Sequence, residues 1–99
     1  MPWSKELTFN KESIDYWVPN SPGVYALMIG KELVYYGMSS VSMKDRLLHH
    51  LAGLAVPATQ KATAFYYQSS NNPLALEKAL LENYRKAKGR LPRYNSKVG

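Results

Sequence analysis

Cysteine is missing from this chain of 99 residues, which excludes disulfide bonds and zinc sites with cysteine ligands. A chain without disulfides fits a reducing compartment. The sequence also lacks an apolar run long enough to span a membrane and an N-terminal stretch of the signal-peptide type. We therefore expect a soluble, cytoplasmic protein that does not enter a membrane.

Acidic residues are scarce, with 7 against 13 lysines and arginines, and the formal net charge is +6. Residues 85–97 contain six basic residues and no acidic one. Such a run is typical of a solvated helix end, where cations favour the helix dipole, and equally of a surface that binds nucleic acid. The composition leaves both interpretations open. The candidate substrate contacts in this run are Lys86, Lys88, Arg90 and Arg93.

The chain has no internal repeat and no linker, so we expect a single small α/β domain. Three runs of β-branched, aromatic and apolar residues predict strands at Val24–Ile29, Leu33–Met38 and Thr63–Tyr67. The first two flank Gly30-Lys31 and form a hairpin. The predicted architecture is a three-stranded, mainly antiparallel sheet flanked by helices.

Three helices are predicted from side-chain caps at their first residues, and these caps are Asn10, Ser42 and Asn72. The helices end near the breakers Pro19, Gly53 and Gly89. We expect residues 1–22 to form an N-terminal extension that packs on a domain of residues 23–99.

Arg46 and His50 are four residues apart on the second predicted helix and share one stripe beside its apolar face. Two exposed helix residues are the ordinary interpretation of this spacing. The alternative is a phosphate site, since a guanidinium clamps phosphate oxygens in a bidentate manner and an imidazole supplies a nearby donor or acceptor.

Glu77 lies in a predicted apolar stripe on the third helix, with Leu74 three residues before it and Leu80 and Leu81 three and four residues after it. A carboxylate in an apolar stripe costs free energy unless it is paired or bound to a metal. It could also be a helix-edge residue whose stem packs while its head reaches water. Glu82, by contrast, lies between Lys78 and Lys86 at salt-bridge spacing and has an ordinary surface role. Without a cysteine or histidine cluster, a metal would be a hard cation on oxygen ligands.

Five short phrases of the chain, in this order, resemble those of the GIY-YIG nuclease superfamily. They are Gly23-Val24-Tyr25, Tyr35-Tyr36-Gly37, "MKDRLLHHL" with Arg46 and His50, "LEKALL" with Glu77, and "PRYN" with Asn95. The resemblance covers residues 23–95. It departs from the family at Met38, where many relatives carry a basic residue, and in the long spacing between Glu77 and Asn95.

The resemblance implies an endonuclease that hydrolyses phosphodiester bonds in DNA with Mg²⁺ or Mn²⁺. Glu77 is the implied metal ligand, Arg46 the clamp on a phosphate oxygen, and His50 a residue that relays or positions a proton. Either Tyr25 or Tyr35 would orient or deprotonate the attacking water. Asn95 would hold backbone or substrate.

The hairpin poses a problem of register, because a two-residue loop at Gly30-Lys31 would place Tyr25 opposite Tyr36. A three-residue loop or a β-bulge would instead place Tyr25 and Tyr35 on one face. The resemblance implies that these two tyrosines converge, and we therefore expect three residues in the loop.

Two other classes of function fit the sequence. A nucleic-acid-binding module without activity would need the basic run but no carboxylate at Glu77. A structural partner domain would need neither. We expect no separate recognition domain in these 99 residues. An enzyme of this kind would then have low specificity, rely on a partner protein, or recognise branched or otherwise structured DNA, as in DNA repair.

Overall fold

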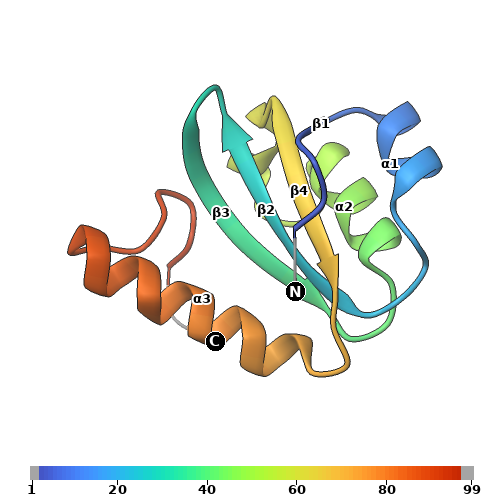
Figure 1. Ribbon diagram of the computed structural model, residues 1–99. Helices are drawn as coiled ribbons and strands as arrows, with labels where there is room; N and C mark the ends of the chain where they lie inside the picture. The colour runs from blue at the N-terminus through green and yellow to red at the C-terminus, as the bar shows by residue number, and fades with distance from the viewer. Residues whose placement is uncertain (1–2, 97–99) are drawn as a thin grey trace.

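Four strands form one antiparallel sheet in the order β1-β4-β2-β3 (Figure 1). The computed structural model of the chain describes residues 3–96, so Lys97 of the basic run lies outside it. The strands are β1 (Leu7–Thr8), β2 (Gly23–Ile29), β3 (Glu32–Ser39) and β4 (Ala64–Ser69). The helices are α1 (Lys11–Trp17), α2 (Met43–Leu51), the 3₁₀-helix η1 (Pro57–Lys61) and α3 (Pro73–Lys88). The predicted α/β class with an antiparallel sheet is confirmed.

The sheet has one strand more than the three that the sequence predicts. Strand β1 has two residues, and Leu7 and Thr8 pair with Phe65 and Ala64 of β4. Two residues are too short to show the alternation by which strands are predicted. The N-terminal segment therefore extends the sheet edge as well as packing on the rest of the domain.

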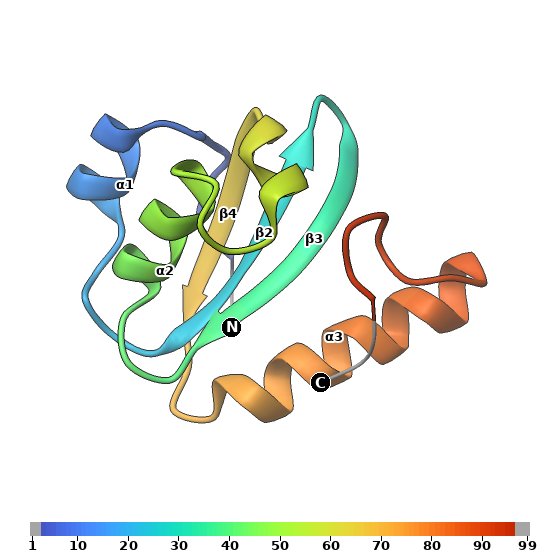
Figure 2. The same ribbon diagram turned by 180° about the vertical axis from the view of Figure 1, so that it is seen from behind.

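The main core lies between the sheet and the pair of helices α1 and α2, which cover one face (Figure 2). Helix α3 lies on the other face, where Tyr84 packs edge-on against Tyr36 of β3. All three predicted N-caps are present, with side-chain oxygens of Asn10, Ser42 and Asn72 accepting from backbone amides. No helix in the described range is both long and apolar enough to cross a membrane. The buried core residues are Leu7, Phe9, Ile14, Val18, Tyr25, Leu27, Val34, Met43, Leu47, Ala62 and Phe65.

The loop of the hairpin has two residues, so the prediction of three was wrong. Ile29 pairs with Glu32 across Gly30-Lys31, and a β-bulge shifts the register between Leu27 and Met28. Beyond the bulge, Leu27 pairs with Tyr35. Because Leu27 and Tyr25 are two residues apart on one strand, Tyr25 and Tyr35 share the face that α2 covers. A bulge rather than a longer loop thus brings the two tyrosines together.

Gly37 makes room for the ring of Tyr25, which pairs with it across the hairpin. A methyl group at Gly37 would lie 2.5 Å from Cζ of Tyr25 and 2.6 Å from its hydroxyl oxygen. Those distances are far inside van der Waals contact, and the ring is fully buried with no room to move aside. Gly37 therefore fixes the position of the Tyr25 ring.

Gly37→Ala is expected to destabilise the protein by about 1–3 kcal/mol through overpacking, and to displace the Tyr25 hydroxyl. Urea unfolding measures the stability. Gly89→Asn is the control, since Gly89 closes α3 in the left-handed conformation with open space around it, where asparagine is tolerated. Equal stabilities of Gly37→Ala and wild type would show that the ring can shift freely.

Candidate active site

A chain of hydrogen bonds joins β2, α2 and η1 in the interior. The hydroxyl of Tyr25 lies 2.8 Å from Nε2 of His50, and Nδ1 of His50 lies 2.8 Å from Oγ1 of Thr59. Oγ1 of Thr59 in turn donates to the carbonyl of Val56 at 2.6 Å. Tyr25, His50 and Thr59 are all fully buried. The side chains of Tyr25 and Thr59 are thus connected through the imidazole of His50.

The last bond of this chain determines which nitrogen of His50 carries the proton. A carbonyl oxygen only accepts, so the single hydroxyl proton of Thr59 points at Val56. Oγ1 of Thr59 must then accept from Nδ1–H of His50. In a neutral ring that leaves Nε2 without a proton, and Nε2 accepts from the hydroxyl of Tyr25. His50 is therefore held as a proton acceptor directed at Tyr25.

Burial keeps His50 neutral. It lowers the pKa of His50 to about 4, and the positive charge of Arg46 adds to this effect. Burial also raises the pKa of Tyr25 well above its ordinary value, against the opposing effect of Arg46. The pair thus rests as a neutral phenol that donates to a neutral imidazole.

The stability of the fold should depend on pH through His50. The unfolded ring titrates near 6.5 and the folded ring at about 4, so unfolding takes up a proton between these values. The contribution of His50 is complete above pH 6.5 and is lost as the pH falls toward 4, by about 3 kcal/mol. Urea unfolding across this range measures it.

His50→Gln should remove this part of the pH dependence, whatever its effect on stability at neutral pH. His49→Gln is the matched control, because His49 is the exposed neighbour on the same helix. Identical pH profiles for wild type and His50→Gln would contradict a buried, neutral His50.

Arg46 lies one turn before His50 on α2, and its side chain is exposed. Its positive charge acts on Tyr25, Tyr35, His50 and Glu77 together, opposing the rise in pKa of both tyrosines and of the glutamate. The ring of Tyr35 lies 5.1 Å from that of His50, between their centroids. The charge of Arg46 therefore acts on all four of the other predicted catalytic residues.

Glu77 of α3 reaches the same region from the side of β3. It lines a cavity of about 190 Å³ together with Tyr35 and Asn95. Burial raises the pKa of Glu77, and Arg46 opposes this rise. Leu81, one turn on, is buried, whereas Leu74 is 57% exposed and does not contribute to the apolar stripe that the sequence suggested.

Asn95 closes the outer edge of the sheet beside this cavity. Its Oδ1 accepts from the amide of Tyr36 at 2.9 Å, and its Nδ2 donates to the carbonyl of Tyr36 at 3.0 Å. The amide of Tyr94 donates to the carbonyl of Val34 on the same edge. The side chain of Asn95 thus replaces a neighbouring strand and holds the backbone next to Tyr35.

The predicted basic contacts lie in two settings. Lys86 and Lys88 are exposed on the last turn of α3, and Arg90 follows its end. Arg93 instead donates two hydrogen bonds to the carboxylate of Glu32, at 2.8 and 3.2 Å. This pair of bonds ties the C-terminal segment to the hairpin. Within the described residues, the guanidinium of Arg93 is therefore engaged with a carboxylate, unlike the side chains of Lys86, Lys88 and Arg90.

The helical ion pairs expected around Glu82 are absent. Among residues 3–96 the ion pairs are Lys11–Asp15 and Glu32–Arg93, and neither Lys78 nor Lys86 pairs with Glu82. Exposed pairs of this spacing gain little over hydration, so the side chains remain apart. Glu82 is nonetheless a surface residue of α3, on a different side of the helix from Glu77.

Sequence reasoning missed Thr59, which sets the tautomer of His50. No spacing rule links the two residues, since a loop separates α2 from η1. The only local signal is Pro57, which opens the short 3₁₀-helix that carries Thr59.

The residues of the cavity fit a hard divalent cation. Mg²⁺ is commonly held by one or two carboxylates with waters and substrate phosphates completing its shell. Glu77 supplies one carboxylate, and no other residue in the described range donates to it or pairs with it. The described residues contain no group of three or more histidine, cysteine, aspartate or glutamate side chains that could hold a metal by themselves. Such a cation would therefore depend on water and on the substrate for its further ligands.

Comparison with solved structures places this fold. The chain is similar to the GIY-YIG N-terminal endonuclease domain of UvrC from Thermotoga maritima bound to its catalytic divalent cation, magnesium, with a TM-score of 0.64 and 22% identity over 87% of this chain and 94% of that one. An asparagine-to-alanine variant of that domain, also with its cation, matches with a TM-score of 0.65 and 20% identity over 88% and 94%. No family model and no curated protein matches the sequence. The chain therefore has the GIY-YIG fold, as the resemblance predicted.

Proposed function

We propose that the protein is a metal-dependent endonuclease that hydrolyses phosphodiester bonds in DNA. The observation that carries this proposal is the convergence of five side chains from four elements of a fold shared with a magnesium-bound endonuclease domain. These side chains are Tyr25, Tyr35, Arg46, His50 and Glu77.

Arg46 is the proposed clamp on the scissile phosphate. Its exposed guanidinium can meet a ligand, and its fork matches two phosphate oxygens. Because its charge acts on Tyr25, Tyr35 and Glu77, a phosphate held by Arg46 would lie in the same region of the fold as these side chains. Charge that develops on the phosphate oxygens in the transition state would be stabilised by this contact.

Tyr25 and His50 form the proposed proton relay. In this relay the attacking water would give its proton to the hydroxyl oxygen of Tyr25, and the hydroxyl proton of Tyr25 would pass to Nε2 of His50. Because Tyr25 is fully buried in the free protein, DNA binding must first open its hydroxyl to that water. The 2.8 Å hydrogen bond between Tyr25 and His50 is already aligned for the second transfer. The bond from Nδ1–H to Thr59 stabilises the imidazolium that results. Tyr35, which lines the cavity of Glu77, orients the phosphate or the water.

Glu77 is the proposed ligand of Mg²⁺ or Mn²⁺. Such a cation supplies charge neutralisation at the phosphate and stabilises the leaving oxygen. Asn95 binds the backbone of Tyr36 at the outer edge of β3. It thereby fixes the neighbouring Tyr35, which lines the cavity. It is therefore a positioning residue in this proposal.

The basic residues after Tyr84 form the proposed track for the DNA backbone, with Lys86, Lys88 and Arg90 exposed for phosphate contacts. We assign the nuclease unit to residues 23–99 and regard residues 1–22 as an extension. Specificity would then come from branched or structured DNA or from a partner protein, and DNA repair is a setting that supplies such substrates.

A cleavage assay tests the enzyme directly. Branched, single-stranded and duplex DNA are incubated with the protein in Mg²⁺ and, separately, in EDTA. Cleavage of at least one substrate in Mg²⁺ and none in EDTA is expected. Cleavage that persists in EDTA would contradict the metal-dependent mechanism.

The second candidate is a nucleic-acid-binding module without activity. The exposed basic end of α3 favours it, since those residues serve binding as well as catalysis. Salt-dependent DNA binding by wild type with no cleavage of any substrate in Mg²⁺ would select this alternative.

A further inference from the structure

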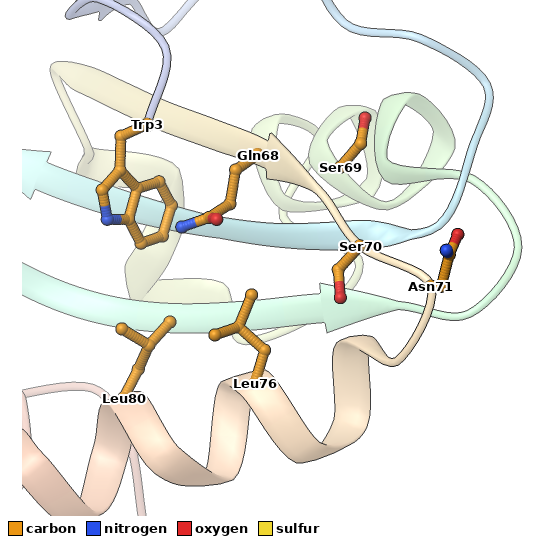
Figure 3. Close-up of a pocket in the computed structure, with 7 residues that line it drawn as sticks. All are labelled: Trp3, Gln68, Ser69, Ser70, Asn71, Leu76 and Leu80. Atoms are coloured by element: carbon orange, nitrogen blue, oxygen red, sulfur yellow. The ribbon is translucent and has the colours of Figure 1, made fainter. Parts of the chain in front are cut away.

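A groove runs along the sheet on the face opposite Tyr25 and His50. Its walls are Trp3, from the segment before β1, and Leu76 and Leu80 of α3, and its floor is Gln68 of β4 (Figure 3). The space amounts to about 640 Å³, within the range of small-ligand sites. Ser70 and Asn71 close one end, where β4 turns into α3. None of these residues belongs to the proposed catalytic machinery.

Gln68 presents an amide to this groove that no residue in the described range binds. The residue is 7% exposed, and its amide end points toward the indole of Trp3 (Figure 3). Among the described residues no fully buried side-chain nitrogen or oxygen lacks a partner, so the amide of Gln68 is open to the groove and can bind a ligand there. Its nitrogen donates and its oxygen accepts, so it can meet a donor and acceptor edge side by side.

Trp3 supplies an aromatic surface next to that amide. Its ring lies nearly parallel to that of Tyr36, at 23° and 6.3 Å between centroids. Trp3 also lines a second, mostly apolar cavity of about 230 Å³, which runs along Met28, Leu33 and Tyr66. Aromatic faces in a row suit planar rings that stack.

The charges in and around the groove favour an uncharged ring as its ligand. The lining of both cavities contains no charged residue, although the chain as a whole carries +6. An uncharged, aromatic site with a free amide suits a neutral heterocycle, while the net charge of the protein attracts a polyanion. A nucleobase on a phosphate backbone combines both properties.

We propose that this groove binds unpaired bases of a DNA strand, stacked on Trp3 and hydrogen-bonded by Gln68. The inference builds on the proposed nuclease function and gives it a substrate class: DNA with a single-stranded flank that crosses from the catalytic face to the opposite face of the sheet. The shared chemistry is the nucleobase, whether it comes from a strand or from a free nucleotide.

Fluorescence of Trp3 tests the proposal without any cleavage. Trp17→Phe leaves Trp3 as the reporter, and EDTA prevents hydrolysis. Titration with a single-stranded oligonucleotide of about 8 nucleotides should quench Trp3, whereas an oligomer of abasic sites with the same charge should not. Equal quenching by both would overturn the proposal. A mononucleotide that binds as tightly as the oligomer would overturn the strand as the source of the base.

Variants distinguish stacking from general attraction. Affinity is measured in EDTA by the fluorescence anisotropy of a labelled oligonucleotide, since the Trp3 variants lack the reporter. Trp3→Ala should weaken oligonucleotide binding about tenfold, and Trp3→Phe should restore most of it. Gln68→Met keeps the volume and should weaken binding severalfold while Trp3 still responds. Unchanged affinity in Trp3→Ala, with native circular dichroism, would overturn the proposal. Base binding in the groove and cleavage in Mg²⁺ are measured separately. The proposed base site and the proposed nuclease activity can therefore be refuted independently.

Discussion

Glu77→Gln is expected to abolish Mg²⁺-dependent cleavage while DNA binding survives. Glutamine keeps the volume of the side chain but removes the anionic oxygen on which a Mg²⁺ site relies. A catalytic cation contributes several kcal/mol to the transition state, so the rate should fall about a thousandfold or more. Phosphate contacts at Arg46 and along the end of α3 remain, and they keep affinity nearly constant.

The stability of Glu77→Gln should equal or exceed that of wild type. Burial raises the pKa of Glu77, which means that its environment disfavours the charged form. Removal of the charge relieves this cost. Cleavage rate, DNA affinity and melting temperature are measured together, so that loss of activity is not confused with unfolding.

Glu82→Gln is the matched control on the same helix. Glu82 forms no ion pair in the described structure, so its replacement should leave activity and stability close to wild type. Full activity in Glu77→Gln together with its loss in Glu82→Gln would show that the other carboxylate holds the metal.

Arg46→Ala is expected to lower kcat about 100- to 1000-fold with a much smaller effect on binding. One bidentate contact among several phosphate contacts adds little to affinity, but it matters most where charge redistributes in the transition state. Because Arg46 is exposed, the fold should tolerate the change. Single-turnover kinetics at saturating DNA separate the chemical step from binding.

Arg46→Lys should recover little of this activity, since an ammonium cannot form the two-pronged contact of a guanidinium. Arg85→Ala serves as the control for general electrostatic attraction, because Arg85 is also exposed but lies near the end of α3. Wild-type turnover in Arg46→Lys would reduce Arg46 to a general electrostatic contact.

Local sequence determined the elements and much of the list of candidate residues. Asn10, Ser42 and Asn72 cap their helices as predicted, because a capping side chain and the amide it binds are only three residues apart. The helical spacing of Arg46 and His50 likewise follows from the geometry of a single turn. The order of the five phrases was sufficient to predict the fold, which the solved structures confirm.

Tertiary structure decided how these residues are used. The bulge that places Tyr35 on the same face as Tyr25 is a feature of the pairing between β2 and β3, and neither strand predicts it alone. Thr59, nine residues from His50, fixes its tautomer, and Asn95 completes an edge 59 residues away at Tyr36. Propensities and caps act over a few residues, whereas register, burial and hydrogen-bond partners follow from the free energy of packing the whole chain. The sequence therefore specified which residues could act, and packing determined which of them meet.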